Sequence, residues 1–166
     1  GKNSALPHGK ASGKKIENGD FIVMDFGCVY NGYCSDMTRT VCVGKPSEKM
    51  EQVYNIVLEA QLKGIAAVKE GIKGKELDKV SRDIIKEAGY GELFGHSLGH
   101  GVGMEIHEAP NASYLSEQVF KENMIITVEP GIYIPDEFGV RIEDFVIVKK
   151  DGCVNMTLAE KTLITL

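Results

Sequence analysis

Apolar runs broken by turn signals predict a β-hairpin near each end of the chain. The stretch FIVMDFGCVY from Phe21 is rich in β-branched and aromatic residues, and Asn31-Gly32 is a strong hairpin-turn signal. YCSDMTRTVCVG then predicts the returning strand. Further on, ENMIITVEPGIYIP, the turn PDEFG and VRIEDFVIVKKDG predict a second hairpin. A final LITL predicts a short edge strand.

Between the hairpins the apolar positions change to helical spacing. Residues 47–69 begin with a serine cap beside an acidic residue, and their apolar positions are Met50, Val53, Ile56, Val57, Ala60 and Ile65. A second helix is predicted from about Lys75 to Ala88, ending at Gly89. The order hairpin, two helices, hairpin predicts an α+β fold with mostly antiparallel pairing.

Composition and charge narrow the class of protein. The 166 residues suit one domain, with 43% hydrophobic and 26% charged residues. A net charge of -5 without a lysine- or arginine-rich block argues against a nucleic-acid partner. No stretch is long and apolar enough to predict a membrane span or a secretory signal. Four cysteines without paired C-x-x-C spacing fit reduced thiols in a cytoplasmic protein.

The segment FGHSLGHGVGMEIHEAP, starting at Phe94, gathers three of the four histidines: His96, His100 and His107. Each of its four interior glycines would cost about 1 kcal/mol in a helix. The segment therefore predicts a passage from loop to strand rather than a helical zinc motif. Taken alone, it also fits histidines that merely decorate a mobile loop.

Hairpin geometry brings carboxylates together. A two-residue turn at Asn31-Gly32 places Asp25 opposite position 38 and Asp36 opposite position 27, so both side chains share one face. A three-residue loop at 135–137 places Glu129 directly opposite Glu143.

Such acid pairs on half-buried strands repel one another, and without a cation the repulsion should raise the pKa values of all four. One pair could lie on a solvated face, but a shared cation explains both pairs. An oxygen-rich set with one imidazole favours manganese, and four acids also suit two metal ions.

Five motifs in order, NSALPHG, MDFG…YCSDMTRT, GHSLGHGVGMEIHE, TVEPGIY and VRIED, resemble those of the Xaa-Pro peptidases. These are aminopeptidase P and prolidase, which share the pita-bread metallopeptidase fold with methionine aminopeptidase. The resemblance implies hydrolysis of the bond between an N-terminal residue and a following proline, through a metal-bridged water. It implies two divalent ions, most naturally manganese, with cobalt or zinc as alternatives. The implied ligands are Asp25, Asp36, His100, Glu129 and Glu143.

The same resemblance implies roles around the metal ions. His107 would contact the scissile peptide and stabilise its tetrahedral intermediate. His96 would line the pocket near the proline, and His8 would lie near the substrate amine. Arg141 would orient the acids. Glu129 would also accept a proton from the attacking water.

Family members carry a separate N-terminal domain and a first helix pair of the catalytic domain ahead of NSALPHG. Residues 1–166 are therefore interpreted as a catalytic-domain fragment that lacks both, from a full-length protein that is expected to be a homo-oligomer. Exposed apolar surface is then expected on the outer side of the first hairpin, around Phe21, Val23 and Val29 or their neighbours.

The sequence leaves three alternatives to an Xaa-Pro peptidase. Methionine aminopeptidase uses the same ligands, but YCSDMTRT has the Xaa-Pro form of its motif. A metal-free binding module and a creatinase-like hydrolase would both have lost ligands, and none is lost here. The sequence does not separate aminopeptidase P from prolidase.

Overall fold

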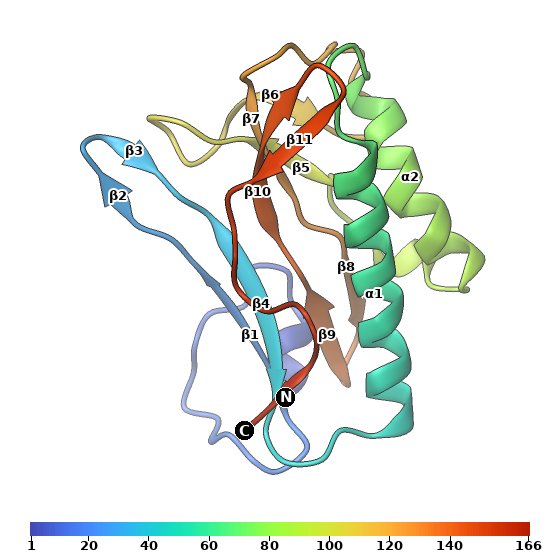
Figure 1. The fold of residues 1–166 in the computed structure, drawn as a ribbon. Helices are drawn as coiled ribbons and strands as arrows, with labels where there is room; N and C mark the ends of the chain where they lie inside the picture. The colour runs from blue at the N-terminus through green and yellow to red at the C-terminus, as the bar shows by residue number, and fades with distance from the viewer.

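Two helices lie side by side across one face of the strands in the computed structural model, which describes residues Gly1–Leu166 (Figure 1). Helix α1 spans Glu48–Ala67, and Ser47 caps it by accepting a hydrogen bond from the backbone of Met50. Helix α2 spans Gly74–Glu87 and runs back along α1. Both helices agree with their predicted ranges to within two residues. Neither is both long and apolar enough to cross a membrane.

The first hairpin has the predicted register. Strands β1 (Phe21–Phe26) and β4 (Met37–Cys42) pair antiparallel with Asp25 opposite Thr38, and β2 (Val29–Tyr30) and β3 (Tyr33–Cys34) form its tip. Asn31 and Gly32 adopt positive φ angles of 49° and 84°, as a tight hairpin turn requires. The C-terminal segment adds β12 (Ile164–Thr165) parallel to β4, so the predicted edge strand is confirmed.

The second hairpin is also confirmed. Strand β7 (Ile125–Val128) continues as β8 (Gly131–Ile134), while β9 (Phe138–Arg141) continues as β10 (Asp144–Lys149). Val128 lies opposite Asp144 and Gly131 opposite Arg141, which is the predicted register.

The second hairpin joins a larger sheet. Three further strands, β5 (Gly99–Gly101), β6 (Glu108–Ala112) and β11 (Gly152–Asn155), complete a five-stranded sheet in the order β11-β10-β7-β5-β6. Short 3-10 helices cover Lys2–Ala5 (η1) and Gly91–Leu93 (η2). The passage of the histidine segment into β5 confirms the predicted change from loop to strand.

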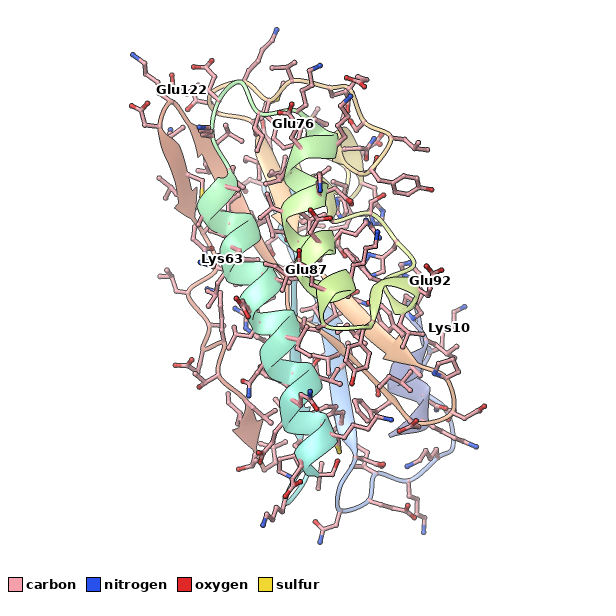
Figure 2. All side chains as sticks on the ribbon, turned by 90° about the vertical axis from the view of Figure 1, so that its right-hand side faces the viewer. Lys10, Lys63, Glu76, Glu87, Glu92 and Glu122 are labelled. Carbon is pink, nitrogen blue, oxygen red and sulfur yellow. The ribbon has the colours of Figure 1, made fainter.

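The hydrophobic core lies between the helices and the strands. Buried residues of α1 and α2, including Val53, Val57 and Leu77, belong to one cluster with Ile126 and Val146 of the sheet. The opposite faces of the helices carry charged side chains, such as Lys63 of α1 and Glu76 and Glu87 of α2, which are labelled in Figure 2. This amphipathic arrangement follows directly from the helical spacing of the apolar positions.

The outer surface of the first hairpin differs from the expectation at its base, where Phe21 is buried and Val23 is half-buried. Phe21 is only 1% exposed, because its ring packs edge to face on Phe138 of β9, with 5.4 Å between the centroids. Val29 is 70% exposed, as expected. Met24 and Phe26, in the second half of β1, are exposed as well. The expected apolar surface is therefore present toward the hairpin tip and absent at the base.

Candidate metal centre and substrate cleft

Three predicted ligands meet where the two hairpins and β5 come together. Asp36 precedes β4, His100 lies in β5, and Glu143 lies between β9 and β10. One ligand atom from each of these residues lies within 4.8 Å of the others. The backbone of Glu143 donates to the carbonyl of Thr38 over 3.0 Å, so a direct contact between the hairpins fixes this approach. Two carboxylates and an imidazole form a suitable donor set for a divalent cation.

Glu129 adjoins this cluster through His100. The Nε2 atom of His100 lies 3.2 Å from Oε1 of Glu129 and 3.7 Å from Oδ2 of Asp36. The Nδ1 atom of His100 lies 3.0 Å from the carbonyl oxygen of Gly101, so the ring is held with Nε2 toward the acids. The hydroxyl of Thr127 donates to Oε1 of Glu129 over 2.9 Å and fixes that carboxylate in turn.

Asp25, the fifth predicted ligand, lies at the rim. Its side chain is 46% exposed, and one carboxylate oxygen accepts a hydrogen bond from the guanidinium of Arg141. The charge on Asp25 still contributes to raising the pKa of Asp36. The structure therefore brings four of the five residues into direct proximity and holds Asp25 beside them through Arg141.

Burial and mutual repulsion perturb the acids. Burial, followed by the charges of Asp25 and Glu129, raises the pKa of Asp36 from an ordinary value of 3.8 to about 6. Burial and the neighbouring acids also raise the pKa of Glu143 well above its usual range. These shifts indicate negative charge that the protein itself does not fully balance. Such a site fits divalent metal ions.

The expectation that all four acids show raised pKa values is wrong for Glu129. Burial raises the pKa of Glu129, but the hydrogen bond from His100 and the charges of the neighbouring histidines outweigh burial and lower it. Burial opposes the charge on His100 as well, yet its bonds to Glu129 and Gly101 raise its pKa. One histidine therefore compensates one of the acids.

A cavity of about 180 Å³ opens beside this cluster. His107 reaches it with its ring centroid 4.3 Å from that of His100. His96 lies on its wall, where Nε2 is 2.9 Å from the hydroxyl of Tyr133 and Nδ1 is 2.8 Å from the carbonyl of Ser97. Burial lowers the pKa of His96. The cavity lining includes the five residues predicted to act around the metal ions and the predicted ligand His100. These six are His8, His96, His100, His107, Glu129 and Arg141.

Sequence reasoning missed two polar residues that connect these groups. The hydroxyl of Tyr133 accepts a hydrogen bond from Arg141 over 3.0 Å and links it to His96. The hydroxyl of Thr38 donates to Oε2 of Glu143 over 2.6 Å. The hairpin register places Thr38 opposite Asp25, which could have indicated its position. Tyr133 has no such signal, because its role depends on which side chains meet across the cleft.

Comparison with known proteins identifies the family. Residues 1–150 match the sequence model of metallopeptidase family M24. The chain belongs to this family. It is 56% identical over 164 residues to an Xaa-Pro dipeptidase of Pyrococcus furiosus, a match that covers 99% of this chain and 47% of that protein. The chain thus spans about half the length of this relative.

Solved structures of similar proteins show the same fold. An Xaa-Pro dipeptidase from Bacillus anthracis superimposes with a TM-score of 0.98 at 57% identity, over 99% of this chain and 46% of that one. An X-Pro aminopeptidase from Thermotoga maritima gives a TM-score of 0.97 at 50% identity, with the same coverage. The predicted resemblance to Xaa-Pro peptidases and the α+β pita-bread fold are confirmed.

Proposed function

We propose that these residues form the catalytic centre of a metal-dependent peptidase that hydrolyses the bond between an N-terminal residue and a following proline. The observation that supports it most directly is the meeting of Asp36, His100 and Glu143 beside a cavity lined by further histidines. Two similar proteins named as an Xaa-Pro dipeptidase and an X-Pro aminopeptidase support the choice of substrate.

The proposed metal ligands are Asp25, Asp36, His100, Glu129 and Glu143. Because four of the five are carboxylates, we propose two divalent ions and favour manganese, with cobalt or zinc as alternatives. When bound, the ions would lower the pKa of a water molecule and polarise the peptide carbonyl. The raised pKa values of Asp36 and Glu143 support this assignment, because a cation would relieve the repulsion that raises them.

The remaining residues of the cleft bind and orient the substrate. Glu129, which accepts from His100 and Thr127, would take the proton from the attacking water. His107 would donate to the developing oxyanion, and His8 would lie near the substrate amine. His96 would line the proline pocket. Arg141 donates to the carboxylate of Asp25 and would orient it.

We propose further that residues 1–166 are a fragment of the catalytic domain of a cytoplasmic, homo-oligomeric protein. The full-length protein would add an N-terminal domain and a first helix pair. Exposure of Met24 and Phe26 on β1 supports this, because a packed helix would cover such side chains.

The test uses the natural protein that contains these residues, with manganese and with a chelator. Xaa-Pro dipeptides, Xaa-Pro-Xaa tripeptides and a Met-Ala-Xaa peptide serve as substrates. Cleavage before proline that the chelator abolishes supports the proposal, and the dipeptide-to-tripeptide ratio separates prolidase from aminopeptidase P. Preferred cleavage of Met-Ala-Xaa would favour methionine aminopeptidase instead. Metal binding without any turnover would favour a binding module.

A matched pair of variants connects this activity to the proposed centre. Glu143→Gln removes a buried proposed ligand and should abolish turnover. Glu137→Gln makes the same change at an exposed residue of the adjacent loop, where Glu137 only pairs with Lys49. It should retain full activity. Equal losses in both variants would argue against the assigned centre.

A further inference from the structure

A partly buried ion pair on α2 lies against the histidine segment. Asp78 is fully buried, and Arg82, one turn later, donates to both of its carboxylate oxygens, from Nε over 2.6 Å and from Nη2 over 2.9 Å. Figure 2 looks onto α2, with Glu76 and Glu87 labelled near its ends and Glu92 beyond it. Burying such a pair is favourable only when further hydrogen bonds satisfy its remaining donors and acceptors.

Those further bonds all go to the backbone of the histidine segment. Arg82 donates to the carbonyl oxygen of Phe94 over 2.8 Å and to that of His96 over 2.7 Å. Asp78 accepts from the backbone N–H of Leu98 over 3.0 Å. The pair therefore hydrogen-bonds to the backbone of Phe94, His96 and Leu98. These residues lie in a stretch that belongs to no helix or strand.

The side chains reinforce this contact. The guanidinium of Arg82 lies 4.2 Å from the centre of the Phe94 ring, within cation–π range. The Phe94 ring in turn meets the His96 imidazole edge to face, with 5.0 Å between centroids. Leu98 extends the connection toward the acids, because its carbonyl accepts from the backbone of Glu129 over 2.8 Å.

We propose that Asp78 and Arg82 are positioning residues that hold the His96 imidazole in the cleft. This inference rests on the proposed peptidase function, since it assigns a contribution to substrate binding and turnover. Neither residue reaches the cavity, so their effect passes entirely through the segment they bind.

The helix contains its own control. Lys79 and Asp83 form an ion pair of the same i,i+4 spacing on α2, but both side chains are exposed and neither bonds to the histidine segment. Lys79→Gln therefore removes a helix ion pair without touching the cleft. Arg82→Lys keeps a positive charge beside Asp78. A lysine at this position cannot bind two carbonyls and a carboxylate at once, because an ammonium lacks the forked donors of a guanidinium.

The first experiment measures kcat, KM and metal content of the natural protein on an Xaa-Pro peptide. Arg82→Lys should lower kcat/KM by about 10- to 100-fold with metal content unchanged, and Lys79→Gln should match the wild type. In a His96→Ala background the same Arg82→Lys change should cost less than about threefold, because the imidazole through which it acts is gone. An equal loss in both backgrounds would overturn the proposal and leave the pair a support of the fold.

The second experiment is independent of turnover. Nitrogen NMR of the four histidine rings should show His96 as one tautomer, with Nδ1–H donating to Ser97 and Nε2 accepting from Tyr133. Arg82→Lys should average the two tautomers, and Lys79→Gln should not. An unchanged His96 signal in Arg82→Lys would refute the positioning role. If the wild type cleaves no Xaa-Pro bond, the proposed function fails, and this measurement still decides whether the pair positions His96.

Discussion

Replacing Asp36 with asparagine should stabilise the metal-free chain and, at the same time, weaken its binding of metal. Asp36 is 7% exposed and lies among the other acids of the cluster. Burial and the charges of Asp25 and Glu129 raise its pKa to about 6, which means that its ionised form destabilises the folded chain. Asparagine has nearly the same shape and no charge, so the substitution removes that destabilisation together with one proposed ligand.

The size of this stability difference follows from the two pKa values of Asp36, 3.8 ordinarily and about 6 in the folded chain. Between these values the folded chain keeps a proton that the unfolded chain has lost, so the wild type loses stability as pH rises through this window. The full effect of roughly two pKa units, about 3 kcal/mol, is present at pH 7.5. At pH 4.5 only about 1 kcal/mol of it has developed. For a chain of this length, about 3 kcal/mol corresponds to roughly 6–12 °C in Tm.

Urea denaturation with a chelator present, at pH 7.5 and at pH 4.5, measures this difference for the wild type and Asp36→Asn. Asp83→Asn is the control, since Asp83 forms only an exposed ion pair and should change stability by less than about 0.5 kcal/mol at both pH values. Elemental analysis after dialysis against manganese should show reduced metal only in Asp36→Asn. A metal-free Asp36→Asn chain that is less stable than the wild type at pH 7.5, or that gains equally at both pH values, would refute the electrostatic reasoning.

Two further predictions separate the roles of residues around the cleft. His100→Ala should lose bound metal, whereas His107→Ala should keep it and lower kcat by about 100- to 1000-fold, because His107 would act on charge that develops only in the transition state; a His107→Ala protein without metal would reverse the assignment. Thr38→Val removes the hydroxyl bond that lowers the pKa of Glu143, so the pH midpoint of metal binding should move upward, as titration calorimetry across pH can measure. An unchanged midpoint would mean that deprotonation of Glu143 does not limit metal binding.

The positions of the acids could be predicted because they depend on local geometry. Asn31-Gly32 permits positive φ at both turn residues, and a two-residue turn then fixes every pair along the first hairpin. The same reasoning holds for the second hairpin, where the register places Glu129 opposite Glu143. Strand register is a property of a few neighbouring residues, so a single sequence is sufficient to derive it.

The orientation of side chains across the cleft could not be derived in this way. Asp25 has the predicted register, yet its carboxylate pairs with Arg141, which comes from a strand more than a hundred residues away. Glu129 has a lowered pKa because one particular histidine lies against it. Phe21 is buried because Phe138 packs on it. Each of these outcomes depends on contacts between hairpins, and no periodicity in the sequence encodes those contacts.

The arginines show how the fold supports the centre from outside the ligand set. The chain has only three, and each pairs with a carboxylate while also donating to backbone carbonyls near the cleft. Arg39 pairs with Asp144 and donates to the carbonyl of Glu143 over 2.6 Å, Arg82 donates to that of His96, and Arg141 to that of Pro7. A guanidinium can bind a carboxylate and carbonyls simultaneously in a fixed geometry, which a lysine ammonium cannot. Because each arginine joins an acid to a different loop or strand end, the three together hold the segments that carry the ligands and the cleft histidines in register with one another.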